Sequence, residues 1–140
     1  MTFFWSFISP VRDNQMAQVA LVALLFLILL DWLFGIGCAC ANHEFSSSKM
    51  REGIAHKCAE LGFVLVGIVA DGLIFAGLDL GFNGPILMAI VTYLCIMEMG
   101  SLLEIFARMN PALAESPVFK LLASAQGKVH DKEETWDSTE

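Results

Sequence analysis

The chain has 140 residues, of which 56% are hydrophobic and 16% charged, and its formal net charge is -7. This length allows at most one ordinary domain, and the composition is more apolar and less charged than that of an average soluble domain, which favours the membrane class. The sequence has no basic stripe that could neutralise phosphates, which argues against a nucleic-acid partner. Residues 131–140 contain five acids and one lysine, so most of the negative charge lies at the C-terminus.

Three stretches are apolar over the length of about 20 residues that a helix needs to cross a bilayer. They are residues 18–41, interrupted by Asp31; residues 61–78, interrupted by Asp71 and extendable back through Glu60 to Ile54; and residues 85–106, which carry Glu98 and Glu104. A soluble helical bundle is the alternative, but these segments lack the polar face that a soluble helix presents to water. We therefore predict an all-α membrane protein with three transmembrane helices, a short C-terminal amphipathic helix and an acidic disordered tail.

The predicted segments follow one another along the chain as alternating loops and spans. They are an extracytoplasmic N-terminal segment (1–15), transmembrane helix 1 (16–41), a cytoplasmic loop (42–53), transmembrane helix 2 (54–80), an extracytoplasmic turn (81–84), transmembrane helix 3 (85–107) and a cytoplasmic tail (108–140). The first span is too long for the apolar region of a signal peptide, so we expect it to be retained.

Local signals mark the ends of these segments. A serine of 46–48 is expected to cap the second helix, and Pro85 suits the first position of the third. Ser116 and Pro117 precede apolar residues at helical spacing, which predicts a short amphipathic helix on the inner membrane surface, with disorder from Gln126 onwards. Aromatic anchors at the outer interface are expected at Phe3, Phe4, Trp5 and Phe7.

The distribution of basic residues predicts the orientation. Arg12 stands alone on one predicted side, whereas seven basic residues lie on the other: Lys49, Arg51, Lys57, Arg108, Lys120, Lys128 and Lys132. By the positive-inside rule, the N-terminus is outside and the C-terminus is cytoplasmic, with Lys49, Arg51 and Lys57 setting the topology of the second span.

Acidic residues inside the spans are the candidate functional residues. Asp31, Glu60, Asp71 and Glu98 are expected at membrane depth with no Lys or Arg among them. An ionised side chain costs about 2.5–3.5 kcal/mol at the centre of a membrane helix, so these acids should face a cavity or a partner helix, or stay protonated. We interpret them as pore-lining or timing acids. In the alternative, they are satisfied by backbone groups or by neighbours such as Thr92 and Ser101.

Other residues have simpler interpretations. Glu104 lies four residues before Arg108, the favourable spacing for an interfacial ion pair. Small residues permit close helix approach, which we expect at Gly35, Gly67 and Gly72.

Neither metal binding nor catalysis is expected. The spacing of Cys38, Cys40, Cys58 and Cys95 matches no zinc pattern, so we expect no metal, cofactor or disulfide. The sequence has no nucleotide-binding, nucleophile-elbow or metalloprotease motif, so we do not expect an enzyme.

An ordered set of short motifs runs through the three spans. Asp31 and Gly35 lie late in the first span, the run 46–57 follows, Asp71 lies in the second span, and the third contains Tyr93, Glu98, Ser101, Leu103 and Glu104. This order resembles the toxin-secretion and phage-lysis holin family, whose signature E-x-x-S-x-L-E is similar to residues 98–104. The resemblance covers residues 30–122, with departures at Ile105, where the family usually has Asn, and at Asn110–Pro111.

The resemblance implies a phage- or prophage-encoded, multi-pass protein of the bacterial (host) cytoplasmic membrane. Such a holin forms a homo-oligomer in the lipid bilayer and opens holes at a programmed time, which releases an endolysin to the cell wall and causes host lysis; some relatives export large toxins. Two alternatives stay open on the residues alone. One is a small oligomeric ion or proton channel, and the other is a structural membrane assembly factor.

Overall fold

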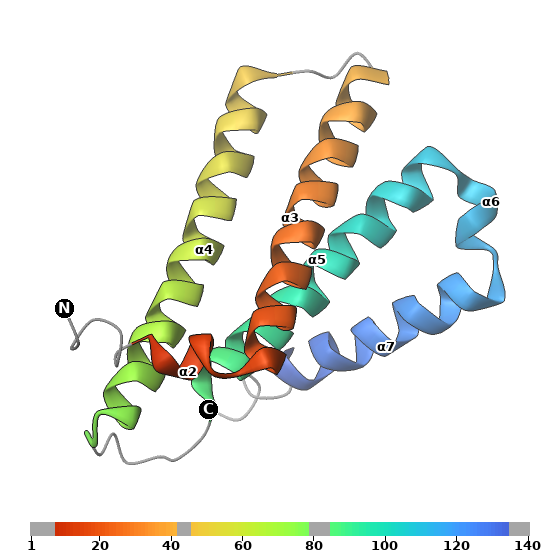
Figure 1. The fold of residues 1–140 in the computed structure, drawn as a ribbon. Coiled ribbons are helices and arrows are strands. Elements are labelled where there is room, and N and C mark those ends of the chain that lie inside the picture. Colours follow the sequence, from red (N-terminus) through yellow and green to blue (C-terminus); the bar gives the residue numbers. More distant parts are fainter. Residues whose placement is uncertain (1–7, 42–45, 79–84, 135–140) are drawn as a thin grey trace.

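The computed structural model describes residues 8–41, 46–78 and 85–134, and this part of the chain is helical with no strand. In chain order the helices are α2 (Ser9–Arg12), α3 (Gln15–Ala41), α4 (Ser47–Phe75), α5 (Ile86–Met109), α6 (Pro111–Ala114) and α7 (Pro117–Glu134). The three longest, α3, α4 and α5, are each long and apolar enough to cross a membrane. They run in alternating directions (Figure 1). The predicted all-α class with three spans is therefore confirmed.

The first span begins at a side-chain cap. Asn14 Oδ1 accepts hydrogen bonds from the backbone N–H groups of Met16 (3.0 Å) and Ala17 (3.3 Å), which satisfies two of the donors that every helix start exposes. The side chain of Gln18 donates to the carbonyl of Val11 (3.3 Å) and ties the short α2 to α3. The start of the span is thus held by local hydrogen bonds.

Helix α4, which contains the second candidate span (Met50–Phe75), differs in its bounds from the range of 54–80 expected for that span. It begins at Ser47, because the polar run after it is rich in Lys, Met, Arg and Glu, which are good helix formers. Ser46 is the N-cap residue, but its hydroxyl hydrogen-bonds the Ser48 hydroxyl (2.8 Å) rather than a backbone N–H of the first turn.

The same span also ends earlier than predicted, at Phe75. Gly77 adopts a φ of +90°, a conformation that side chains disfavour, and its N–H donates to the Ile74 carbonyl at 3.0 Å. The N–H of Leu78 donates to the Leu73 carbonyl, also at 3.0 Å. These two bonds form a Schellman motif, which terminates a helix.

The third span leads into a helix that doubles back. Asn110 follows the last residue of α5 and is also the N-cap of α6. Its Oδ1 accepts a hydrogen bond from the backbone N–H of Ala112 (3.2 Å) in the first turn of α6. Ser116 Oγ accepts from the N–H of Phe119 (3.2 Å) at the start of α7. Figure 1 shows α7 returning beside α5. A cavity of about 320 Å³ lies between them, walled only by apolar and sulfur-containing residues: Ile96, Met99, Leu102, Leu103, Phe106, Leu122 and Ala125.

The expected amphipathic helix after Ser116 is present, but disorder from Gln126 is wrong, because α7 continues to Glu134. The continuation contains good helix formers such as Gln, Lys and Glu, and no proline. The expected aromatic anchors at residues 3–7 and the expected turn at 81–84 lie outside the described residues, as do residues 135–140.

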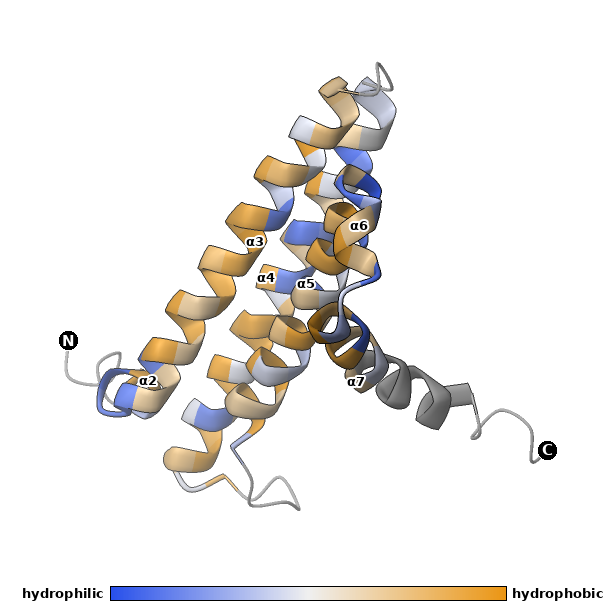
Figure 2. Cartoon of the chain, turned by 90° about the vertical axis from the view of Figure 1, so that its right-hand side faces the viewer, coloured by the Kyte–Doolittle hydropathy of each residue, from blue (hydrophilic) through white to orange (hydrophobic). Residues whose placement is uncertain are grey.

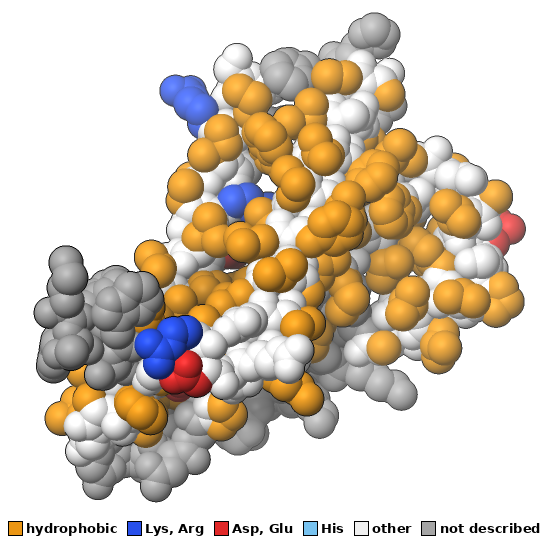
Figure 3. Space-filling model, in the orientation of Figure 1, with side chains coloured by type: hydrophobic (Ala, Val, Ile, Leu, Met, Phe, Trp, Pro, Cys, Tyr) orange, Lys and Arg blue, Asp and Glu red, His pale blue; other side chains and the backbone are white. Residues whose placement is uncertain are grey.

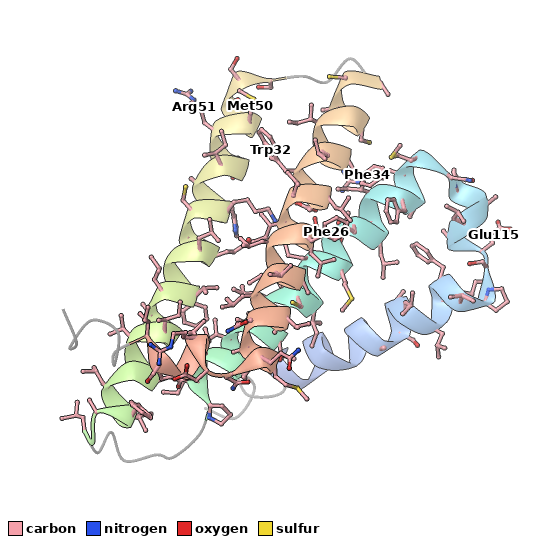
Figure 4. The ribbon with its side chains drawn as sticks, viewed as in Figure 1. Phe26, Trp32, Phe34, Met50, Arg51 and Glu115 are labelled. Atoms are coloured by element: carbon pink, nitrogen blue, oxygen red, sulfur yellow. The ribbon has the colours of Figure 1, made fainter. Side chains whose placement is uncertain are left out.

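Helix α5 is the centre of the bundle, because α3 and α4 each pack chiefly on α5 rather than on each other. The core contains Ala17 and Leu24 from α3, Val64 from α4, and Leu87, Ile90, Val91 and Leu94 from α5. Outside this core, the ring of Phe34 on α3 (labelled in Figure 4) meets that of Phe106 on α5 edge to face, with centroids 5.1 Å apart.

Most of the remaining apolar side chains face outwards. Figure 3 shows a surface dominated by hydrophobic side chains with few charges, and in Figure 2 short hydrophilic stretches interrupt otherwise hydrophobic spans. On α3 the exposed residues include Val19, Val22, Leu25, Phe26, Leu29 and Leu33. Such a surface suits contact with lipid, and the charged side chains inside the bundle are the exception to explain.

Helices α4 and α5 approach each other closely at Gly67. A Cβ at this position would lie 3.0 Å from Cδ1 of Ile90 and 3.1 Å from Cα of Leu87, whereas a Cβ at Gly62 meets nothing within 4 Å. Gly67→Ala should therefore destabilise the protein by about 1–3 kcal/mol relative to Gly62→Ala, because the helices must separate to admit the methyl group. The free energy of unfolding in detergent micelles measures this difference, and equal stability of the two variants would contradict the packing described.

Candidate functional site

The ammonium group of Lys57 lies between carboxylates from all three long helices. Its Nζ is 3.1 Å from Oδ2 of Asp31 on α3 and 3.6 Å from Oε2 of Glu60 on α4. It also donates a hydrogen bond to Oε1 of Glu98 on α5. We call these four residues, Asp31, Lys57, Glu60 and Glu98, the Lys57 cluster.

The cluster lies about half-way through the bundle. Lys57 is ten residues after the start of α4 at Ser47, and Asp31 is ten residues before the end of α3 at Ala41. At 1.5 Å per residue, each lies about 15 Å from that end of its helix. Glu98 is near the middle of α5. Because a hydrocarbon core is about 30 Å thick, a membrane crossed by these three helices would enclose the cluster.

The expectation that no Lys or Arg lies among the acids is therefore wrong. Lys57 was assigned to the cytoplasmic end because the second span was predicted to begin at residue 54. Since α4 begins at Ser47, Lys57 falls inside the membrane-length part of the helix, which spans Met50–Phe75. Spacing along α4 identifies only one of its partners, because Glu60 is three residues away and shares its face. Asp31 and Glu98 are brought to Lys57 by the packing of α3 and α4 on α5.

The side chains of the cluster are largely buried, so the pairing of their charges affects the stability of the protein. Glu98 is 2% exposed and is one of the two buried polar or charged residues in the described part of the chain. The side chains of Asp31, Lys57 and Glu60 are each less than one-fifth exposed. Three buried oxygens, Asp31 Oδ1, Glu60 Oε2 and Glu98 Oε2, have no hydrogen-bond partner among the described residues. One ammonium group with at most three donors therefore faces more carboxylate oxygens than it satisfies.

Asp71 is separate from this cluster and holds the start of α5. Its Oδ1 accepts from the N–H of Ile86 (2.9 Å) and its Oδ2 from the N–H of Leu87 (3.2 Å). A carboxylate at a helix N-terminus pairs with exposed backbone donors and with the positive end of the helix dipole. Asp71 also lines a cavity of about 430 Å³ with Ser9 and Asn14. Because α4 ends at Phe75, Asp71 is one turn from the helix end, and its contacts are backbone N–H groups rather than other charged side chains.

The remaining predicted site residues contribute no described charged group to the cluster. Arg108 Nη2 is 3.7 Å from Glu104 Oε2, and their side chains are 69% and 76% exposed. The Cδ1 of Ile105 lies 4.0 Å from where a Cβ of Gly35 would be, and Gly72 is buried in α4. Arg51 is exposed near the start of α4 (Figure 4), and the side chain of Lys49 is outside the described part.

The cysteines do not converge with acids or histidines on a metal site. Cys38 and Cys95 are half-buried and Cys40 and Cys58 exposed, all as thiols. Among the described residues, no group of three or more His, Cys, Asp or Glu side chains is arranged to hold a metal ion.

Three membrane-length helices with charged side chains gathered between them define a small multi-pass membrane protein. The model of the bacteriophage holin family matches residues 15–118, which contain all three spans and the whole Lys57 cluster. The chain therefore belongs to the bacteriophage holin family. No curated protein and no solved structure matches it.

Removing the cation tests the energetic role of the cluster. Lys57→Met should destabilise the protein by about 3–5 kcal/mol, because it leaves buried carboxylates without a counter-ion. Lys120→Met, at an exposed position of α7, is the control. Unfolding of the full chain in detergent micelles measures both, and adding Glu98→Gln to Lys57→Met should recover part of the loss because it removes one unpaired charge. A Lys57→Met protein as stable as the control would contradict the pairing.

Proposed function

We propose that this protein is a holin that associates with copies of itself in the cytoplasmic membrane of the bacterial host. At a programmed time the assembly opens holes large enough for a folded endolysin to reach the cell wall, and the host lyses. Family membership supports the proposal, and the Lys57 cluster is the observation that connects it to residues.

The cluster supports two states of the chain. In the single chain, charged groups from three helices face one another inside the bundle, where they are shielded from lipid. Three helices packed around a filled core enclose no path for a protein, so a hole requires many copies. In such an assembly the acids gain by facing water, because an ionised group at membrane depth costs about 2.5–3.5 kcal/mol in lipid.

The proposed orientation keeps the N-terminus outside and the C-terminus in the cytoplasm. With Lys57 placed inside the bundle, six basic residues remain on the proposed cytoplasmic side and Arg12 alone on the other. The imbalance still favours the same orientation by the positive-inside rule. In Figure 1 the start of α3 and the end of α4 lie at one end of the bundle, and the end of α3 and the start of α4 at the other.

Co-expression in a bacterium tests the function. The chain expressed with an endolysin that has no export signal should cause an abrupt fall in culture turbidity at a reproducible time, because the hole admits the enzyme to the wall. A folded cytoplasmic reporter enzyme should appear in the medium at the same time. Endolysin alone is the control and should leave turbidity unchanged.

The size of the released solute separates the alternatives. Loss of potassium with full retention of the reporter enzyme would contradict the holin proposal and favour an ion channel. A membrane that stays impermeable to both, with the protein present at normal levels, would favour a structural assembly factor.

Asp71 provides a test of timing. Asp71→Leu removes both hydrogen bonds to the start of α5, so the contact between α4 and α5 loosens and lysis should begin earlier than in the wild type. Asp71→Asn retains one acceptor oxygen and should shift the time less. Glu104→Gln, on the exposed end of α5, should keep the wild-type time. Unchanged timing in both Asp71 variants at normal protein levels would rule out a role for Asp71 in timing.

A further inference from the structure

We propose that the Lys57 cluster is a proton-binding site, in which the neighbouring carboxyl groups of Glu60 and Glu98 hold one acidic proton between them while the three helices are packed. The proton comes from water, and its uptake forms one O–H bond on a carboxylate with no transfer of electrons. Binding of this proton does not depend on hole formation. The effect of the proton on opening rests on the proposed function.

The charge balance of the cluster requires something more than Lys57. Three carboxylates and one ammonium group carry a net charge of -2 when all are ionised, at a depth where charged groups are poorly tolerated. Binding one proton reduces this to -1 and binding two removes it. No Arg or second Lys is paired with these carboxylates in the described part of the chain, and the one further basic side chain that contacts them there, His56 beside Glu60, becomes positive only by binding a proton itself. We therefore look to protons as the source of the missing positive charge.

Buried carboxylate oxygens without a hydrogen-bond partner also indicate a proton at Glu60 and Glu98. Glu98 is almost fully buried, and while its Oε1 accepts from Lys57, its Oε2 is buried with no partner. Glu60 Oε2 lies 3.6 Å from the same Lys57 Nζ and also has no hydrogen-bond partner among the described residues. A proton on either carboxyl group adds a hydrogen-bond donor to a cluster that has more buried acceptor oxygens than donors.

The groups that face this carboxyl pair come from each of the three packed helices. Asp31 on α3 lies across Lys57, and on α4 the exposed His56 has its Nδ1 3.8 Å from Oε1 of Glu60. On α5 the half-buried Cys95 precedes Glu98 by three residues, a spacing that places the two side chains on the same side of the helix. Lys57 is the one group of this set that is cationic over the whole physiological range. Its attraction opposes proton uptake, and repulsion among the carboxylates together with burial favours it.

The proposal predicts the direction in which pH shifts the equilibrium between the packed and the open states. When water enters the cluster, burial no longer disfavours ionised carboxylates, so the water-lined state binds fewer protons than the packed state. A rise in pH therefore favours opening, and a fall in pH favours the packed bundle.

Infrared spectroscopy of the full chain in phospholipid vesicles tests the site directly. A carboxylic-acid C=O band should be present at neutral pH, shift when the glutamates carry ¹³C-labelled carboxyl groups, and disappear on raising the pH. Glu98→Gln and Glu60→Gln should each remove the band. Glu104→Gln, a matched change at an exposed glutamate of α5, should leave it unchanged.

Each other outcome overturns the proposal. Absence of a labelled acid band at neutral pH would mean that both glutamates are ionised. A band that survives both Glu60→Gln and Glu98→Gln in helical, vesicle-inserted protein would place the proton elsewhere. A band that sodium or potassium removes at constant pH would assign the site to a metal cation. Since the readout does not involve lysis, failure here leaves the holin proposal standing, and loss of the holin activity leaves the proton site standing.

Discussion

The constraint on which the rest of the structure depends is the placement of one lysine and three acids at the middle of a bundle that lipid surrounds. Because α3 and α4 pack chiefly on α5, the contacts of Lys57 with Asp31 and Glu98 are what join all three spans at this level. Charged side chains that are unfavourable in contact with lipid therefore face one another inside the bundle. The helices can separate only if these groups find water or other partners, which links the stability of the packed chain to its proposed assembly.

The two ends of the bundle are held by interactions of other kinds. At one end, Asp71 caps α5 while Gly67 allows α4 and α5 to touch, so this helical hairpin is closed by backbone hydrogen bonds and backbone proximity. At the other end, Phe34 meets Phe106 and α7 returns beside α5 over an apolar cavity. The charged centre of the bundle and its two ends are therefore held by separate interactions.

Prediction from sequence succeeded where a property depends on neighbours along the chain. The uniform apolar stretches predicted the three spans, and the spacing of Glu104 and Arg108 predicted two side chains that the structure places 3.7 Å apart. Prediction from sequence failed at the ends of helices and in the C-terminal tail. Helix α4 begins at Ser47 and ends at Phe75 because good helix formers and a glycine C-cap outweigh hydropathy. Helix α7 continues through a polar segment that composition alone suggested would be disordered.

The sequence by itself determined the class of protein, the number of spans and the presence of acids within them, because hydropathy, length and residue identity are local. Only the tertiary structure decided that Asp31, Glu60 and Glu98 share one lysine, and that Asp71 belongs to a helix cap. Residues 31, 57 and 98 lie on three different helices, and their distances depend on the rotation and depth at which those helices pack. That geometry is set by Gly67 and the apolar core, and no single segment of the chain contains it.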